Sequence, residues 1–130
     1  MRQTFTKDER LTRDNLIGLL FNEGFSFFIH PFRVTWLIHE IPSAKPAQIL
    51  ITVPKQNFRK AVDRNLLKRR IREAYRKNKH ILYDMLNVKH LTMILGITYA
   101  AKEIVPSPVI HEKIILLLQR LKEENAETAG

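Results

Sequence analysis

Residues 55–79 carry the most visible chemistry in the chain, because they concentrate positive charge. They hold eleven Lys and Arg against two acids, Asp63 and Glu73, which gives a net charge of +9. The other 105 residues hold eleven bases and eleven acids and are neutral overall. The whole net charge of the chain therefore lies in this one segment. A field focused in this way attracts a polyanion.

Helical spacing of about 100° per residue sorts residues 57–77 into two arcs. An apolar arc that can dock on a sheet contains Leu67, Ile71, Ala74 and Tyr75. The other arc, named here the basic ridge, contains Asn65, Lys68, Arg69, Arg72 and Arg76. Four more cations adjoin it, namely Arg64 at the border of the apolar arc and Lys55, Arg59 and Lys60 before the helix. Like charges at this spacing destabilise a helix, and a surface made for solubility mixes signs. We therefore expect these residues to bind phosphate, which Arg grips with two donors.

Three kinds of polyanion are candidate partners of the basic ridge: a membrane surface, DNA and structured RNA. A membrane surface needs a free apolar face on the helix, and the core requires that face. DNA is not expected, because no helix-turn-helix, zinc-finger or zipper pattern occurs in the sequence. Structured RNA fits best, since it is recognised through shape and backbone contacts that a rigid cationic helix can supply.

Two further helices are predicted around this segment. The first runs from about residue 13 to residue 23, with Thr12 as its cap and Gly24 ending it in a left-handed conformation. The last follows a proline pair, with Ser107 as its cap and Pro108 at its first position. Its apolar stripe contains Ile110, Ile114, Leu117, Leu118 and Leu121.

Period-two alternation predicts strands over 32–39 and 47–53, and an apolar run predicts another over 91–99. Helices and strands alternate, so we expect a two-layer α/β sandwich. The expected organisation is one RNA-binding domain over residues 1–122 and a frayed tail over 123–130.

Composition excludes several other classes of protein. The chain has no Cys, which rules out disulfides, thiolate zinc sites and a cysteine nucleophile. No run approaches the roughly 20 apolar residues of a membrane span, and the polar first ten residues indicate no signal peptide. The five His show no metal-ligand spacing, and no paired-carboxylate motif occurs. We therefore expect a cytoplasmic protein with no catalytic or metal-ligating residues of its own.

Residues 53–76 resemble the signature of the bacterial ribonuclease P protein subunit. The family pattern places a lysine after a strand, then an alanine, an Arg-Asn-Arg run with Lys-Arg after it, and Arg-Glu before an aromatic residue and Arg. The matching residues are Lys55, Ala61, Arg64, Asn65, Lys68, Arg69, Arg72, Glu73, Tyr75 and Arg76. Phe21 and Gly24 also match a family motif at the end of the first helix. Leu66 and Gln56 depart from it, since each stands where the family has a basic residue.

The resemblance implies a ribonucleoprotein that removes the 5′ leader from precursor transfer RNA. The RNA subunit would perform the hydrolysis with Mg²⁺, which it would mainly bind itself, and the basic ridge with its lead-in would contact that RNA. The resemblance also implies an α+β fold of order αβββαβα with a small mixed sheet of three to four strands. Its βαβ crossover would have the uncommon left hand, as in one domain of a ribosomal protein.

The same resemblance implies a cleft between the first helix and the sheet that holds the single-stranded leader. Aromatic residues are dense in that part of the chain, and aromatic faces stack on unpaired bases. Phe21 and Trp36 are the residues expected in that cleft. Two other functions stay open at this point: a general structured-RNA-binding or ribosome-associated protein, and a protein-only nuclease.

Overall fold

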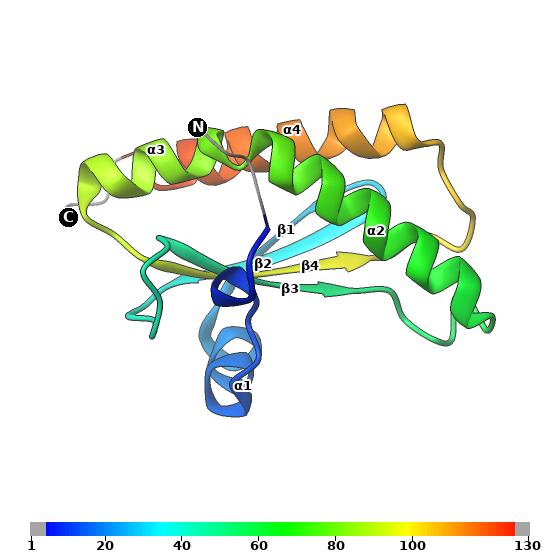
Figure 1. Ribbon diagram of the computed structural model, residues 1–130, viewed down its shortest axis with the longest axis horizontal. Coiled ribbons are helices and arrows are strands. Elements are labelled where there is room, and N and C mark those ends of the chain that lie inside the picture. Colours follow the sequence, from blue (N-terminus) through cyan, green and yellow to red (C-terminus); the bar gives the residue numbers. More distant parts are fainter. Residues whose placement is uncertain (1–4, 127–130) are drawn as a thin grey trace.

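The computed structural model describes residues 5–126 and has a four-stranded mixed sheet at its centre (Figure 1). The strands are β1 (Phe25–Ile29), β2 (Phe32–Ile38), β3 (Ala47–Thr52) and β4 (Met93–Tyr99). In space their order is β1-β2-β4-β3, with β3 parallel to β4 and the other pairs antiparallel. The three predicted strands, two from alternation and one from an apolar run, are confirmed as β2, β3 and β4. Alternation did not identify β1, because Phe28 places a large apolar side chain on its exposed face.

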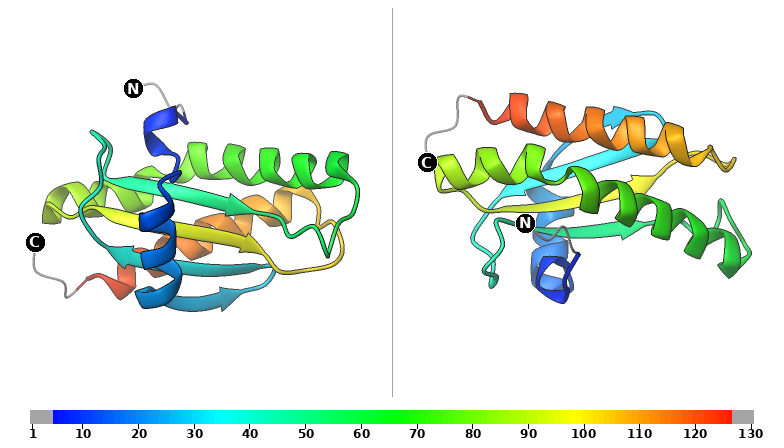
Figure 2. Two further views of the ribbon diagram at one scale, coloured as in Figure 1. Left: turned by 90° about the horizontal axis from the view of Figure 1, so that it is seen from below. Right: turned by 45° about the horizontal axis from the view of Figure 1, so that its top comes forward.

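Helices lie on both faces of this sheet. They are the short 3₁₀ helix η1 (Lys7–Glu9) and the α-helices α1 (Asp14–Glu23), α2 (Ala61–Asn78), α3 (His80–Lys89) and α4 (Ser107–Glu124). Figure 1 shows α2, α3 and α4 on one face, which confirms the predicted two-layer sandwich. On the other face α1 runs across the strands and adds a partial third layer, which the sequence did not predict (Figure 2).

The connection from β3 to β4 is the βαβ crossover. The chain leaves β3, passes back over the sheet through α2 and α3, and enters β4 beside and parallel to β3. In Figure 1 both strands point the same way, β3 is nearer the viewer and the helices lie above, so the crossover is left-handed. Most such connections are right-handed. The hand implied by the family resemblance is therefore confirmed.

Alternation along the strands separates two apolar cores. Toward α2–α4, β2 contributes Phe32, Val34 and Trp36 to the main core. The predicted stripe of α4 closes this core with side chains that are fully buried: Ile110, Ile114, Leu117, Leu118 and Leu121. A smaller core lies beneath α1 and contains Leu11, Leu16, Leu20 and Ile94. The main core therefore holds α2, which carries the basic ridge, against the sheet, and the smaller core holds α1.

The ends of α1 differ from those predicted. Thr12 is not its cap, because the helix begins at Asp14 with Arg13 in the capping position. Gly24 does follow the helix, but its φ of −72° is not left-handed. Glycine is required there by close approach, since a Cβ would lie 2.3 Å from the carbonyl oxygen of Leu20 and 3.0 Å from that of Trp36.

The ends of α4 also differ. Pro106 occupies the capping position, so Ser107 is the first helical residue rather than the cap. The helix continues through Glu124 and Asn125 is buried, so residues 123–125 of the expected frayed tail are ordered; residues 127–130 lie outside the described residues. No helix within residues 5–126 has the length and apolar character that a membrane span needs.

A buried carboxylate ties the N-terminal segment to the junction of α2 and α3. Glu9 is fully buried, and its Oε2 accepts hydrogen bonds from Lys79 Nζ at 2.7 Å and Tyr83 OH at 2.5 Å. The backbone N–H of Thr6 donates to its other oxygen. Burial alone would raise the pKa of Glu9, but the hydrogen bonds from Lys79, Tyr83 and Thr6 outweigh it and lower the pKa. Burial raises the pKa of Tyr83, so that phenol keeps the proton it donates.

We expect Glu9→Gln to lower the free energy of unfolding by about 3 kcal/mol at pH 7, because it leaves Lys79 without its buried counter-charge. The folded pKa of Glu9 lies below its ordinary value of 4.5, so this stabilisation is present above pH 4.5 and is lost as the pH falls through the folded pKa. Urea unfolding of both proteins from pH 7 to pH 3 should show the difference shrinking below pH 4.5. Glu112→Gln, at an exposed position on α4, is the control and should change little.

Candidate nucleic-acid interface

The helix that carries the basic ridge, α2, packs on the sheet through the apolar arc predicted from the sequence. Leu67, Ile71, Ala74 and Tyr75 are all fully buried in the main core. Tyr75 also contacts Tyr83 of α3 through a hydrogen bond between the two hydroxyls. Figure 2 shows that α2 lies at the surface of the molecule. The opposite arc of α2 therefore faces outward along the length of the helix.

The basic ridge lies on this outward arc. Asn65, Arg69 and Arg72 are exposed, and Lys68 and Arg76 are half-buried. Within residues 5–126, no carboxylate lies within ion-pair distance of Lys68, Arg69 or Arg72. The ridge is thus one face of one rigid helix, and its central cations carry uncompensated charge.

Glu73 pairs with two cations at the end of the ridge. Its carboxylate accepts from Arg76 at 2.6 Å and lies 3.6 Å from Lys77 Nζ. The hydrogen bond from Arg76 holds the pKa of Glu73 below its usual range. Arg69 and Arg70 also lie within about one turn of Glu73, but neither forms an ion pair with it in the described part of the chain.

The cations before the helix divide into two groups. Lys55, Arg59 and Lys60 are exposed and extend the positive surface beyond the ridge. Arg64 is half-buried and turns inward, where its Nη1 donates to the carbonyl oxygens of Phe58 at 2.7 Å and Arg59 at 2.9 Å. Arg64 therefore holds the segment that enters α2, in addition to lying beside the ridge.

Leu66 and Arg70 lie on the flank of α2 nearer to α4. Helical geometry places Leu66 about 100° from Asn65, and Arg70 on this flank donates to the carbonyl oxygen of Val105. The departure of Leu66 from the family pattern therefore removes charge at this flank.

Phe21 and Trp36 do not lie in one cleft, contrary to the prediction. Phe21, on α1, is 51% exposed and lies over the face of the sheet that α1 covers. It lies directly above Gly96, since a Cβ added to that glycine would be 3.5 Å from Phe21 Cζ. Trp36 is 7% exposed and belongs to the main core on the other face, stacked on Phe25 at 4.9 Å between ring centroids. The reason is the period of two, which puts Trp36 on the same face as Val34.

The strand face beside α1 carries two exposed residues that sequence reasoning missed. Arg33 and Phe28 face each other across the β1–β2 pair, on the same face as Thr35 and Gly96. We name Phe21, Phe28 and Arg33 the α1-side surface. The alternation that buried Phe32 and Val34 was a signal for Arg33, because it requires Arg33 to point the other way.

Metal-ligating side chains do not gather in the described part of the chain. Among residues 5–126, no three His, Asp or Glu side chains lie close enough together to hold a metal ion. Glu9 is engaged by Lys79 and Tyr83, and Glu73 by Arg76.

A four-stranded α+β fold with a one-sign helical ridge and an exposed aromatic surface defines a nucleic-acid-binding protein of the class that recognises structured RNA. Residues 5–122 match the family model for ribonuclease P. The ribonuclease P protein component of Porphyromonas gingivalis is 36% identical over 99 residues, covering 76% of this chain and 72% of that protein. The component from Thermotoga maritima is 30% identical over 125 residues, covering 94% and 99%.

Solved structures agree. The ribonuclease P protein from Thermotoga maritima superposes with a TM-score of 0.67 at 29% identity, covering 86% of this chain and 96% of that one. A mutant of the Staphylococcus aureus protein gives 0.68 at 22% identity, covering 89% and 90%, which supports the fold. The chain belongs to the bacterial ribonuclease P protein family. It is a protein subunit of that endoribonuclease, a ribonucleoprotein whose family role is RNA binding in the 5′ processing of transfer RNA.

We expect Arg64→Lys to lower the free energy of unfolding by about 1–2 kcal/mol, because a lysine cannot reproduce both bonds to the carbonyls of Phe58 and Arg59. Denaturant unfolding measures the change. Arg69→Lys, exposed on the same helix, is the matched control and should stay within about 0.5 kcal/mol of wild type. Equal losses in the two variants would show that the hydrogen bonds of Arg64 do not stabilise the entry to α2.

Proposed function

We propose that the basic ridge, with Lys55, Arg59, Lys60 and Arg64, binds the RNA subunit of ribonuclease P. The single observation that carries this proposal is that Lys68, Arg69 and Arg72, on the outward arc of α2, have no carboxylate partner among the described residues. Because α2 is docked through fully buried side chains, these cations are held in place before RNA arrives. Binding then releases counterions without first ordering the helix.

The residues of the basic ridge differ in the contacts that they can offer to RNA. Arg69 and Arg72 present guanidinium groups with no carboxylate partner in residues 5–126, which suit bidentate contact with phosphate oxygens. Arg76 is oriented by Glu73, whose carboxylate accepts from its Nε and Nη2. Asn65 adds a neutral donor and acceptor to the exposed arc.

The α1-side surface is proposed to bind the 5′ leader of precursor transfer RNA. Phe21 and Phe28 are 51% and 54% exposed and offer aromatic faces on which unpaired bases stack. Arg33 lies beside Phe28 and supplies a cation for the leader backbone. Trp36 is not part of this proposal, because it is buried on the opposite face.

Hydrolysis is proposed to be the work of the RNA subunit. Mg²⁺ would supply the metal chemistry when held mainly by phosphate oxygens of the RNA, with waters retained. The side chains of residues 5–126 do not offer a fitting set of ligands. The protein residues therefore neutralise phosphate and hold the leader, and we place the assembly in the cytoplasm with its transfer RNA substrate.

Reconstitution tests this function. The protein should raise 5′-leader removal by a bacterial ribonuclease P RNA at low Mg²⁺, measured by gel analysis of precursor transfer RNA. Protein that bound unrelated folded RNAs equally well, without raising cleavage, would indicate a general RNA-binding protein. Cleavage by the protein with no RNA subunit present would indicate a protein-only nuclease.

The triple variant Lys68→Gln, Arg69→Gln, Arg72→Gln should bind the RNA subunit more weakly, because it removes three phosphate contacts. The slope of log affinity against log salt should become shallower by about 2–3, at about 0.7–0.9 per contact. The matched control replaces three exposed lysines elsewhere, Lys45, Lys102 and Lys122, by Gln and so has the same net charge. Equal weakening in both variants would show that net charge, and not the ridge, sets affinity.

Phe21→Ala should weaken binding of precursor transfer RNA to the holoenzyme by about 1–3 kcal/mol for each base that Phe21 stacks. Binding of leaderless mature transfer RNA should not change. Phe25→Ala is the control, since Phe25 is 61% exposed but lies over Trp36 on the other face. A loss with Phe25→Ala that matched that of Phe21→Ala would contradict the proposed leader surface.

A further inference from the structure

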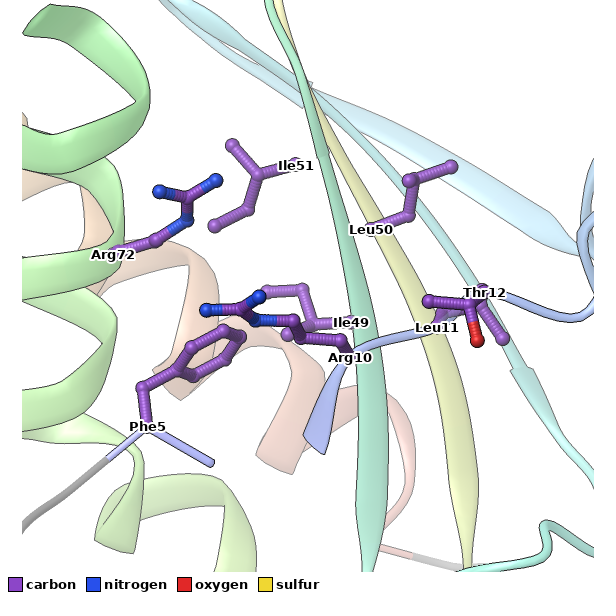
Figure 3. A pocket seen from close by; sticks show the side chains of 8 residues that line it. All are labelled: Phe5, Arg10, Leu11, Thr12, Ile49, Leu50, Ile51 and Arg72. Carbon is purple, nitrogen blue, oxygen red and sulfur yellow. The ribbon is translucent and has the colours of Figure 1, made fainter. Parts of the chain in front are cut away.

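A pocket of about 150 Å³ lies where the N-terminal segment, β3 and α2 meet (Figure 3). Phe5, Ile49 and Ile51 provide apolar walls, and Arg10 and Arg72 lie on either side of it. Figure 3 shows both guanidinium groups pointing into the space between α2 and β3. The pocket is smaller than the roughly 300–1,000 Å³ of sites for drug-sized ligands, so it suits one small group.

The N-terminal segment reaches this place by pairing with the edge of the sheet. The N–H of Leu11 donates to the carbonyl of Ile49 at 2.9 Å, and Arg10 pairs with Ile49 in a parallel bridge. Alternation then sends Leu11 into the core beneath α1 and Arg10 toward α2. Further along β3, the outward N–H of Ile51 has no backbone partner within the described residues.

Two cations here lack a counter-charge among the residues that the structure describes. Neither Arg10 nor Arg72 has an ion-pair partner within residues 5–126; Arg10 lies over the ring of Phe5, 5.8 Å from its centroid. The acids that neighbour Arg10 in sequence point elsewhere. Glu9 is buried against Lys79, and Asp8 accepts a hydrogen bond from the backbone of Ala44. Two guanidinium groups that line one pocket and have no carboxylate partner in the described part of the chain form an arrangement that an anion completes.

We propose that this pocket binds a phosphate group of an unpaired nucleotide in the RNA subunit, with the sugar or base against Ile49 and Ile51. The inference rests on the proposed function and extends it from the helix to the N-terminal segment. Arg72 belongs to the basic ridge, so the pocket is continuous with the surface proposed for RNA. A recess of this size admits the phosphate group of one nucleotide of a single strand, with the rest of the nucleotide at its rim, but not a duplex.

The clamp at Glu9 prepares this site. Because Glu9 is fixed by Lys79 and Tyr83, the next residue, Arg10, is held at the edge of β3 before any ligand binds. The guanidinium groups of Arg10 and Arg72, from segments about sixty residues apart, are brought together only by this packing.

Arg10→Gln tests the pocket through the affinity of the full-length protein for a bacterial ribonuclease P RNA transcript. We expect about a tenfold loss, with the salt slope shallower by about 0.7–0.9. Arg13→Gln is the matched control: it is an exposed arginine three residues away, outside the pocket, with the same change in net charge, and should cost less than twofold. Equal effects of the two variants would overturn the proposal. Arg10→Lys should recover only part of the affinity, because it lacks the second donor.

A double-mutant cycle tests whether the two arginines share one phosphate. Arg10→Gln combined with Arg72→Gln should lose less than the product of the single losses, since either change alone disrupts the shared contact. Arg69 lies on the same helix as Arg72 but outside the pocket. The affinity losses of Arg10→Gln and Arg69→Gln should therefore multiply in the double variant. Multiplicative losses in both pairs would overturn the shared site.

An acidic peptide is the competing occupant. Binding of decaglutamate that fell about tenfold with Arg10→Gln, while binding of the RNA transcript was unchanged, would overturn the proposal in favour of a protein partner. The two proposals fail separately. Wild-type protein that did not bind the RNA transcript would sink the proposed function, whereas wild-type binding with Arg10→Gln equal to Arg13→Gln would sink only the pocket.

Discussion

Like charges crowd along the outward side of α2, and the burial of its opposite arc holds them on one rigid element. Each close pair of like charges costs a helix a few tenths of a kcal/mol, while full burial of a large apolar side chain contributes about 1.5–3 kcal/mol. Leu67, Ile71 and Tyr75 are fully buried, so docking outweighs repulsion. A polyanion that neutralises the ridge removes the repulsion and leaves the docking intact, which favours the bound state.

The acids that touch the basic segment orient it more than they neutralise it. Glu73 fixes Arg76 near the end of the ridge, and Glu9 holds Lys79 from a segment far away in the sequence. Neither acid reaches Arg69 or Arg72. The helix is therefore anchored at its C-terminal end and along its buried arc, while its central cations keep their charge for a partner.

The topology places the basic ridge and the α1-side surface on opposite faces of the sheet, and the N-terminal segment connects the two faces at the edge of β3. The left-handed crossover places α2 over the face opposite α1, so the sheet lies between the basic ridge and the α1-side surface. The N-terminal segment crosses the edge of β3 and contributes to both sides, with Arg10 toward α2 and Leu11 beneath α1. A single rigid sheet thus sets the distance between the surfaces proposed for the RNA subunit and for the leader.

The sequence by itself determined the two arcs of α2 and the alternation of β2 and β3, because helix and strand periods fix which side chains share a face. It also identified the family, through the motif from Lys55 to Arg76. It did not determine what covers each face, and so Trp36 was placed beside Phe21 although α1 lies on the other side of the sheet. The bonds from Lys79 to Glu9 and the meeting of Arg10 with Arg72 have no local signature. They arise from packing between distant segments, which a period of two or 3.6 residues does not encode.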